Sequence, residues 1–301
     1  MRASVVIPTK DRKDELRAAI LSALKQTIPL EVIVMDDGAN DGTAAVMSLE
    51  FPAIRYYCLS EGRGPAFQRN RGVELVSSEI VFSIDDDSVF ASPHTVAQTL
   101  EEFDDPRVAA VGIPFINVKQ DERIWQKASE KHKIQVIAEF VGAAHAIRRD
   151  VFSKLGGFRE HLFYMGEEGD LCLRMLEAGY VTRLGSADPI HHYESPRRSF
   201  QRMDYYGTRN LILFAWQNVP WLWLIPHLGA TTWNALRHAL LPERFLTRLR
   251  AVIDGYWLCL SGRVSRTPVR GRTYRLHRQL KRDGILPFED VIPYLSANTD
   301  G

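Results

Sequence analysis

Short apolar runs alternate with segments of helical spacing over the first 110 residues, and this alternation most limits what the chain can fold into. The apolar runs predict strands over residues 3–7, 30–35, 54–58, 80–84 and 108–111. The segments between them predict helices over residues 14–26, 42–49, 65–76 and 95–103. Because strands separated by helices usually run parallel in one sheet, we expect an α/β fold with a mostly parallel central sheet.

The alternation weakens after residue 120. There the pattern predicts strands over Phe140–Ile147 and Tyr180–Leu184, and helices over Arg149–Leu155 and Gly169–Ala178.

Polar residues gather at three of the predicted strand ends. Thr9-Lys10-Asp11 follows the first strand, Asp36-Asp37 the second and Asp85-Asp86-Asp87 the fourth. Ligands of open parallel sheets bind beyond the carboxyl ends of the strands. The three clusters therefore predict one binding site, although Asp36-Asp37-Gly38 taken alone favours a simple turn.

The three adjacent aspartates indicate a cation site. Neighbouring carboxylates repel one another unless a positive charge offsets them, and a hard divalent cation with oxygen ligands would do so. Alternate residues of an extended segment point the same way, so Asp85 and Asp87 are expected to share one face. A solvated acidic turn is the plain alternative. A phosphatase with an aspartate nucleophile fits Asp-Asp-Asp-Ser-Val poorly.

Three further segments carry candidate functional residues. Glycines and arginines of residues 61–72 suit a phosphate, although surface arginines explain them equally well. Glu167-Glu168-Gly169-Asp170 begins a predicted helix, where acids commonly complement the dipole but can also supply a general base. His191 and His192 lie in a predicted loop. They could be metal ligands or histidines with a structural role.

The chain of 301 residues is long enough for one large domain and an appended region. Residues 197–283 hold 16 Lys and Arg against 4 Asp and Glu, and five of the six tryptophans. We therefore expect a catalytic domain over residues 1–200 and a basic, Trp-rich helical region over 201–301. The apolar stretch 211–233 is interrupted by two prolines and by polar residues, so it suits helices on a membrane surface, a packed subdomain or a homodimer contact.

Other features bear on location and partners. The three cysteines show neither a zinc-site spacing nor a disulfide framework. Residues 3–7 already form a predicted strand rather than part of a signal peptide. We expect a cytoplasmic protein, free or peripheral on the inner face of the cytoplasmic membrane. No nucleic-acid-binding motif accompanies the basic charge.

Together these motifs resemble the inverting glycosyltransferases of family two. The matching segments are, in order, VVIPTKDR, VIVMDDGANDGT, GPAFQRNRG, FSIDDDS, GGFREHLFYMGEEGDLCLRMLEAGY and HHYES, over about residues 3–200. The resemblance implies a GT-A (Rossmann-like) nucleotide-diphospho-sugar transferase domain, followed here by a C-terminal helical region.

The resemblance also implies residue roles. The nucleotide-sugar would be bound by Pro8, Thr9, Asp11, Arg12, Asp36, Asp37, Arg63, Gly64, Arg69, Asn70, Asp85 and Asp86. Mn²⁺ or Mg²⁺ would be held by Asp85, Asp87 and His192, with His191 as the alternative to His192. Glu168 would be the catalytic base, with Glu167 and Asp170 as rivals because Glu replaces the usual Asp at position 168. Ala39 stands at a position where the family more commonly has Ser.

The implied reaction moves a sugar from a UDP-, GDP- or dTDP-linked donor to a carbohydrate or lipid-linked acceptor hydroxyl. Bacterial cell-surface polysaccharide or glycolipid synthesis is the expected setting. One alternative is a sugar-1-phosphate nucleotidyltransferase, although Pro8-Thr9-Lys10-Asp11 lacks the Gly-rich loop that such an enzyme has after its first strand. The other is a noncatalytic, membrane-associated scaffold with the same fold.

Overall fold

A computed structural model describes residues 2–194, 199–237 and 241–295. The main sheet has nine strands in the order β13-β9-β11-β6-β10-β4-β1-β2-β3. Their bounds are β1 (Ala3–Thr9), β2 (Leu30–Asp36), β3 (Arg55–Cys58), β4 (Ile80–Ile84), β6 (Val108–Gly112), β9 (Gln135–Ile137), β10 (Ala144–Arg148), β11 (Val181–Leu184) and β13 (Leu286–Pro287). A second sheet has the order β5-β12-β7-β8, with β5 (Ser88–Phe90), β7 (Phe115–Asn117), β8 (Ile124–Trp125) and β12 (Ile190–His192).

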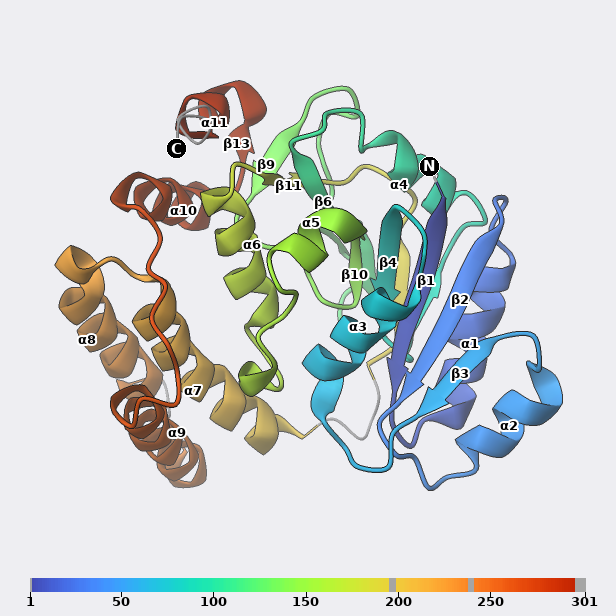
Figure 1. Cartoon of the computed structure of the whole chain (residues 1–301), viewed down its shortest axis with the longest axis horizontal. Coiled ribbons are helices and arrows are strands. Elements are labelled where there is room, and N and C mark those ends of the chain that lie inside the picture. Colours follow the sequence, from blue (N-terminus) through green and yellow to red (C-terminus); the bar gives the residue numbers. More distant parts are fainter. Residues whose placement is uncertain (1, 195–198, 238–240, 296–301) are drawn as a thin grey trace.

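Four of the five strands predicted in the first 110 residues form one half of the main sheet, and the fifth, β6, lies in the other half. β1 pairs in parallel with both β2 and β4, and β2 pairs in parallel with β3. In the other half, β10 runs antiparallel to β4 and β6. The expected α/β fold with a large central sheet and C-terminal helices is confirmed (Figure 1).

Helices cover both faces of this sheet. One face carries α1 (Lys13–Leu24), α2 (Thr43–Glu50) and α4 (Thr95–Glu101), and the other carries α3 (Gly64–Leu75), α5 (Arg149–Lys154) and α6 (Glu167–Glu177). Side chains alternate along a strand, so Val5 and Ile7 join the core under α1 while Val6 joins the core under α3. A Cβ on Gly72 would lie 2.3 Å from a methyl of Val6. Glycine at this position therefore allows α3 to pack closely on β1.

Two predicted local structures differ from those observed. The strand expected over Phe140–Ile147 begins only at Ala144, because residues before it make a turn closed by the Ala144 N–H and the Val141 carbonyl. The histidine pair lies in strand β12 rather than in a loop, because residues 190–192 pair with both β5 and β7. These pairings join segments far apart in the chain.

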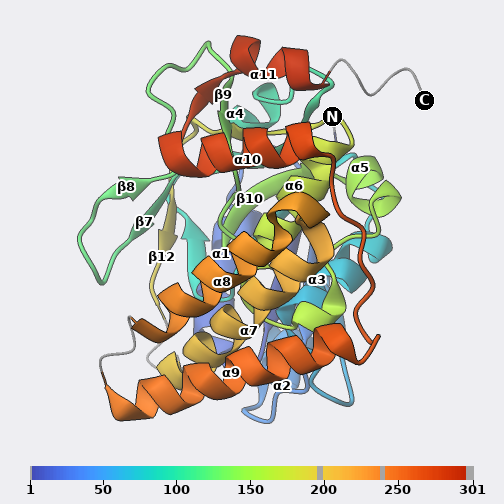
Figure 2. The same cartoon turned by 90° about the vertical axis from the view of Figure 1, so that its left-hand side faces the viewer.

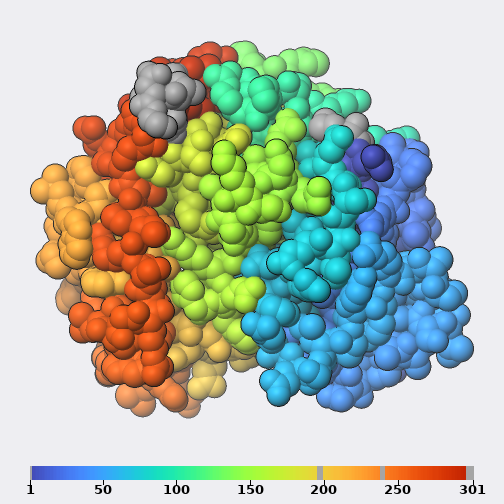
Figure 3. Space-filling view, viewed as in Figure 1, coloured from blue at the N-terminus to red at the C-terminus, as the bar shows by residue number. Residues whose placement is uncertain are grey.

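The C-terminal third forms a helical layer and then returns to the main sheet. Helices α7 (Phe200–Asn218), α8 (Trp221–Arg237) and α9 (Pro242–Leu260) lie together (Figure 2). They share an apolar cluster that also includes Leu162 and Leu173. Helices α10 (Gly271–Asp283) and α11 (Phe288–Leu295) then flank β13, which pairs with β9. In the space-filling view of Figure 3, segments from the middle of the chain lie between the N-terminal half of the sheet and this helical layer. The expected domain boundary at residue 200 stays a prediction.

Among the helices within residues 2–194, 199–237 and 241–295, none combines the length and the hydropathy needed to cross a membrane.

Candidate functional site

The ends of β1 and β4 are joined by hydrogen bonds to the central aspartate of the triplet. Thr9 Oγ1 donates to Asp86 Oδ2 over 2.8 Å, and Arg12 Nη1 donates to Asp86 Oδ1 over 2.8 Å. Arg12 Nη1 also donates to Asp87 over 3.2 Å. Burial raises the pKa of Asp86 to about 7, although the Arg12 charge opposes this. Thr9, Arg12 and two of the predicted aspartates therefore lie together.

The outer aspartates meet His192 in a group suited to a divalent cation. Strand β12 places His192 opposite Ser88, and its Nε2 lies 3.3 Å from Asp87 Oδ1. Asp85, Asp87 and His192 each offer one ligand atom, and these atoms all lie within 4.8 Å of one another. Two carboxylates and an imidazole suit Mn²⁺, and carboxylates alone suit Mg²⁺. The donor set therefore fits the metal that the sequence predicts.

Arg69 connects this group to the first turn of α6. Its guanidinium donates to Asp85 Oδ1 over 2.6 Å and to Glu167 Oε1 over 3.4 Å, and its Nε donates to Ser83 over 3.2 Å. The residue is only 4% exposed. Arg69 is therefore not the surface arginine that an ordinary helix would carry, and its buried charge serves two carboxylates.

The other residues of the Gly-rich segment hold a neighbouring loop. Asn70 exchanges two hydrogen bonds of 2.8 Å with the backbone of Phe158. The exposed Arg63 pairs with Glu160 over 3.3 Å. Gly64 adopts a positive φ of 82°, and a Cβ there would meet Phe163. These contacts fix the loop of residues 158–163 against α3.

The aspartates around the end of β2 support backbone turns. Asp36 is fully buried and accepts hydrogen bonds from the Ala39 N–H over 2.7 Å and from the Tyr56 hydroxyl. Burial raises the pKa of Asp36. Asp37 accepts from the backbone N–H groups of Arg63 and Gly64, over 2.7 and 3.2 Å.

Asp11 and Pro8 complete this edge. Asp11, at a positive φ of 54°, accepts from the Asn40 N–H over 2.7 Å. Pro8 lies within β1 opposite Met35, one residue before Thr9 and Asp36. All the predicted residues of the first two strand ends thus lie at one edge of the sheet.

Asp170 is held as a structural counter-ion. It is fully buried, and its Oδ1 accepts from Arg159 over 2.7 Å and from Asn218 over 2.8 Å. Its Oδ2 accepts from Arg174 Nε over 2.8 Å. Both carboxylate oxygens of Asp170 are therefore occupied by hydrogen bonds within the protein. This geometry favours the two glutamates over Asp170 as the proton acceptor.

The two glutamates at the start of α6 lie beside Arg69. Burial raises the pKa of Glu167, against the opposing charge of Arg69. Burial, followed by the charge of Glu167, raises the pKa of Glu168 to about 8. A Cβ on Gly142 would lie 2.2 Å from Glu168 Oε1, so the carboxyl packs directly on the backbone there. A single glycine before β10 gives no signal in the sequence, and Gly142 was not among the predicted residues.

The chain is similar to known proteins. The model of the Glycosyl transferase family 2 matches residues 4–160, which is more than half of the chain. The O-antigen chain rhamnosyltransferase RfbN of Salmonella typhimurium is 26% identical over 229 residues, which cover 69% of this chain and 71% of the relative. The glucosyl-dolichyl phosphate glucuronosyltransferase of Haloferax volcanii is 25% identical, with 59% of this chain and 64% of the relative covered.

Solved structures share the fold. The mannosyltransferase PcManGT from Pyrobaculum calidifontis, in complex with GDP-Man and Mn²⁺, has a TM-score of 0.59 and 19% identity over 86% of this chain and 87% of that chain. S. aureus TarS 1-349, in complex with UDP-GlcNAc, has a TM-score of 0.61 and 16% identity over 99% and 90% of the two chains. With the family match and the sheet-edge site, these likenesses lead to one conclusion: the chain belongs to glycosyl transferase family 2 and is a glycosyltransferase.

Proposed function

We propose that this enzyme moves a sugar from a nucleotide-diphosphate donor to an acceptor hydroxyl, with inversion at the anomeric carbon. One observation carries the proposal: Arg69 joins the Asp85, Asp87 and His192 group to the glutamates at the start of α6. A group suited to a metal-bound diphosphate therefore lies close to a carboxyl suited to accept a proton.

The donor would bind at the carboxyl ends of β1, β2 and β4. Complexes of fold neighbours with GDP-Man and UDP-GlcNAc support a nucleotide-sugar there. Asp11 and Asp37 would lie beside the nucleoside, and Arg12 would face the diphosphate. Asp36, which the sequence also suggested as a nucleotide contact, is fully buried and would only hold the turn behind them. Asp85, Asp87 and His192 would hold Mn²⁺ or Mg²⁺, which would offset the negative charge of the leaving nucleoside diphosphate. Asp86 would position Thr9 and Arg12 rather than bind metal.

Glu168 would act on the acceptor. Its raised pKa suits a general base that works near neutral pH. Glu168 would take the proton of the acceptor hydroxyl while that oxygen forms a bond to the anomeric carbon. The bond from this carbon to the diphosphate would break on the opposite face, and the electron pair would leave with the nucleoside diphosphate.

Bacterial cell-surface polysaccharide is the acceptor class that the relatives favour. They include O-antigen chain rhamnosyltransferases of Salmonella and the succinoglycan biosynthesis protein ExoU of Rhizobium meliloti. The acceptor would be a growing carbohydrate or a lipid-linked sugar, reached from the cytoplasm.

A thermal-shift panel tests the donor side. UDP-, GDP- and dTDP-sugars are each added with and without Mn²⁺ or Mg²⁺. A ligand that binds only the folded state stabilises it by about 2.7 kcal/mol at 100 times its Kd. We expect one donor family to raise Tm only when the metal is present. The proposal fails if no donor does so.

Two additions separate the alternatives: nucleoside triphosphates and sugar 1-phosphates are added to the panel, and release of nucleoside diphosphate from the donor is assayed. A sugar-1-phosphate nucleotidyltransferase would instead respond to a nucleoside triphosphate or a sugar 1-phosphate. A noncatalytic scaffold would bind the donor without ever hydrolysing it, whereas a transferase is expected to release nucleoside diphosphate slowly in the presence of Mn²⁺.

A further inference from the structure

The outer face of α8 is apolar, and that of α9 combines large apolar side chains with Arg250, whose side chain is 79% exposed. Residues 211–236 contain no Asp, Glu, Lys or Arg. On α8 the exposed large side chains are Trp221, Leu222, Ile225 and Trp233, each at least 66% exposed. On α9 they include Leu246, Ile253, Trp257 and Leu260, each at least 53% exposed. So many exposed large apolar side chains on two neighbouring helices are typical of a docking face.

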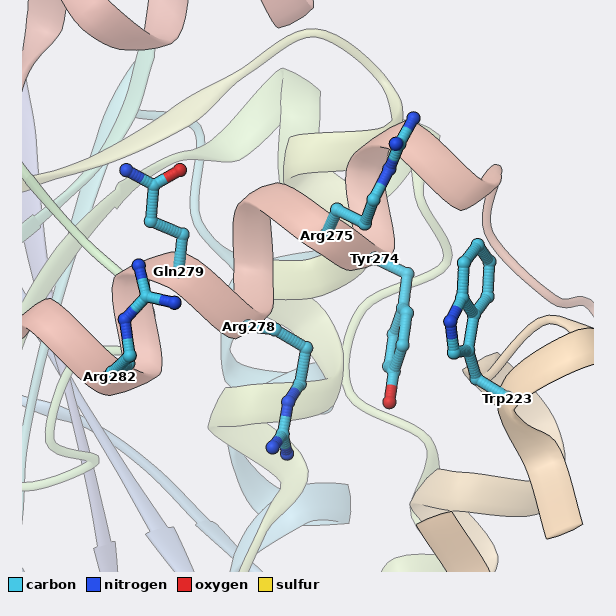
Figure 4. A pocket seen from close by; sticks show the side chains of 6 residues that line it. All are labelled: Trp223, Tyr274, Arg275, Arg278, Gln279 and Arg282. Atoms are coloured by element: carbon cyan, nitrogen blue, oxygen red, sulfur yellow. The ribbon is translucent and has the colours of Figure 1, made fainter. Parts of the chain in front are cut away.

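A hollow of about 440 Å³ lies between α8 and α10. Figure 4 shows its lining, with Trp223 entering from α8 and the other side chains coming from α10. The lining residues are Trp223, Tyr274, Arg275, Arg278, Gln279 and Arg282. The rings of Trp223 and Tyr274 lie 5.3 Å apart. One wall of the hollow is therefore aromatic, and α10 supplies three guanidinium groups.

The charge of this hollow is largely uncompensated. Within the part of the chain that the structure describes, Arg275 and Arg278 have no carboxylate partner, and Arg282 pairs with Asp283 over 2.7 Å. The hydroxyl of Tyr274 is bonded to His227 Nδ1 over 2.8 Å. Burial lowers the pKa of His227 to about 4, so the positive charge belongs to the arginines. An anion is the ligand that such a hollow accepts.

We propose that α8, α9 and α10 form a face that binds an anionic lipid bilayer, with the α8–α10 hollow taking a headgroup phosphate. Guanidinium groups bind phosphate oxygens in pairs, and exposed tryptophans favour the headgroup region of a bilayer. Figure 2 shows the three helices on the same side of the molecule, so apolar insertion and phosphate binding use one surface.

A second copy of the chain fits this face less well. A two-fold symmetric contact places the same patch on both partners. Such a contact would bring the uncompensated Arg275 and Arg278 towards their own equivalents, and like charges oppose that contact. The bilayer supplies the opposite charge instead.

Vesicle sedimentation tests the phosphate part of the proposal. The full chain is mixed, without donor, with vesicles of pure phosphatidylcholine or of phosphatidylcholine and phosphatidylglycerol in equal parts. We expect binding to the anionic vesicles and a fall of roughly 30-fold for Arg275→Gln/Arg278→Gln, since each basic side chain near an anionic surface contributes about fivefold. Lys25→Gln/Lys154→Gln removes the same charge from exposed positions elsewhere and should bind like the wild type.

A second double variant and a fluorescence measurement test whether the exposed apolar side chains insert into the bilayer. Ile225→Gln/Leu260→Gln should weaken binding to the anionic vesicles while the Tm stays near that of the wild type, because both side chains are exposed. Lipids brominated near the headgroup should quench tryptophan fluorescence of the wild type. Asp87→Ala should bind vesicles normally, which separates this proposal from the catalytic one.

Three outcomes would overturn the proposal. The first is equal binding to both kinds of vesicle, and the second is unchanged binding of the double arginine variant. The third is a stable dimer in solution that Ile225→Gln/Leu260→Gln converts to a monomer, because the apolar face would then belong to a second copy.

Discussion

Glu168 is a carboxyl whose surroundings oppose its ionisation. It lies next to Glu167 and packs on the backbone of Gly142, and its pKa is raised to about 8. A base must be ionised to accept a proton, so the fraction ready to react falls as pH falls below this value. The site would therefore favour mildly alkaline conditions.

The first prediction concerns Glu168→Gln. The amide cannot accept the acceptor proton, so we expect turnover to fall by about 10²–10⁴-fold while donor binding is kept. In the wild type, kcat/KM for the acceptor should rise with pH and fall about tenfold per pH unit below the pKa of Glu168, which is about 8 without donor and should be lower once the donor is bound. Steady-state kinetics over a pH series checks both. A variant with normal turnover would move the base to Glu167.

The two adjacent histidines allow a test of the metal group, with His192 as the tested ligand and His191 as the control. Only His192 contributes an atom to the group with Asp85 and Asp87, whereas His191 points to the other side of β12. We expect His192→Ala to lose most of the Mn²⁺-dependent donor binding, and His191→Ala to keep it. Calorimetric titration of the donor with and without Mn²⁺ measures this. Equal losses in both variants would contradict the assignment.

At the scale of the elements, Asp170 ties α6 to its neighbours. Its partners come from the loop before α6, from α6 itself and from the end of α7. Asp170→Asn leaves Arg159 and Arg174 without their shared buried carboxylate. Breaking a buried pair in this way costs about 3–5 kcal/mol.

Chemical denaturation measures this cost. The control is Glu74→Gln, which removes an exposed pair with Arg71 and should change the free energy of unfolding by no more than about 1 kcal/mol. Similar values for both variants would show that Asp170 has no structural role.

Elements specified by local pattern were the ones that the sequence predicted well. β1, β2, β4 and the helices between them follow continuous apolar runs or helical spacing, and the predicted bounds lie within a few residues of those observed. Strands of three residues, such as β5 and β12, are stabilised only by pairing with distant segments. No local window carries that information.

The same distinction holds for the site. The grouping of Asp85, Asp87 and Thr9 could be predicted because they lie at or just after the ends of buried strands. The buried position of Arg69 depends on Glu167, far along the chain, and the structural role of Asp170 depends on Arg159 and Asn218. Each of these facts requires the tertiary fold.

At the scale of the molecule, the C-terminal helical layer makes direct hydrogen bonds to the region around the main sheet, beyond the chain connection at residue 200. Asn210 of α7 donates to the carbonyls of Leu162, Tyr164 and Met165 over 2.6–2.9 Å, just before α6 begins. The strand β13 adds to β9 at the edge of the main sheet. Residues after 200 therefore support the loop that leads to Glu168.

Cutting the chain after residue 199 tests whether the expected boundary separates independent domains. We expect the fragment 1–199 to lose its cooperative thermal transition or to melt well below the full chain, because it lacks Asn210, Asn218 and β13. Differential scanning calorimetry of both proteins gives the comparison. A fragment that melts sharply at the Tm of the full chain would establish residue 200 as a true domain boundary.

Because Arg69 contacts both the metal group and the glutamates, it should affect the order in which the substrates bind. It now divides its charge between Asp85 and Glu167, and it also acts on Glu168. When the bound donor and its metal interact with Asp85, Arg69 is expected to interact more strongly with Glu167 and Glu168. This would favour the ionised forms of the two glutamates. The enzyme would then follow a compulsory order, donor before acceptor, and product-inhibition patterns would reveal it. Before the donor binds, a smaller fraction of Glu168 would be ionised, and the acceptor hydroxyl would react more slowly.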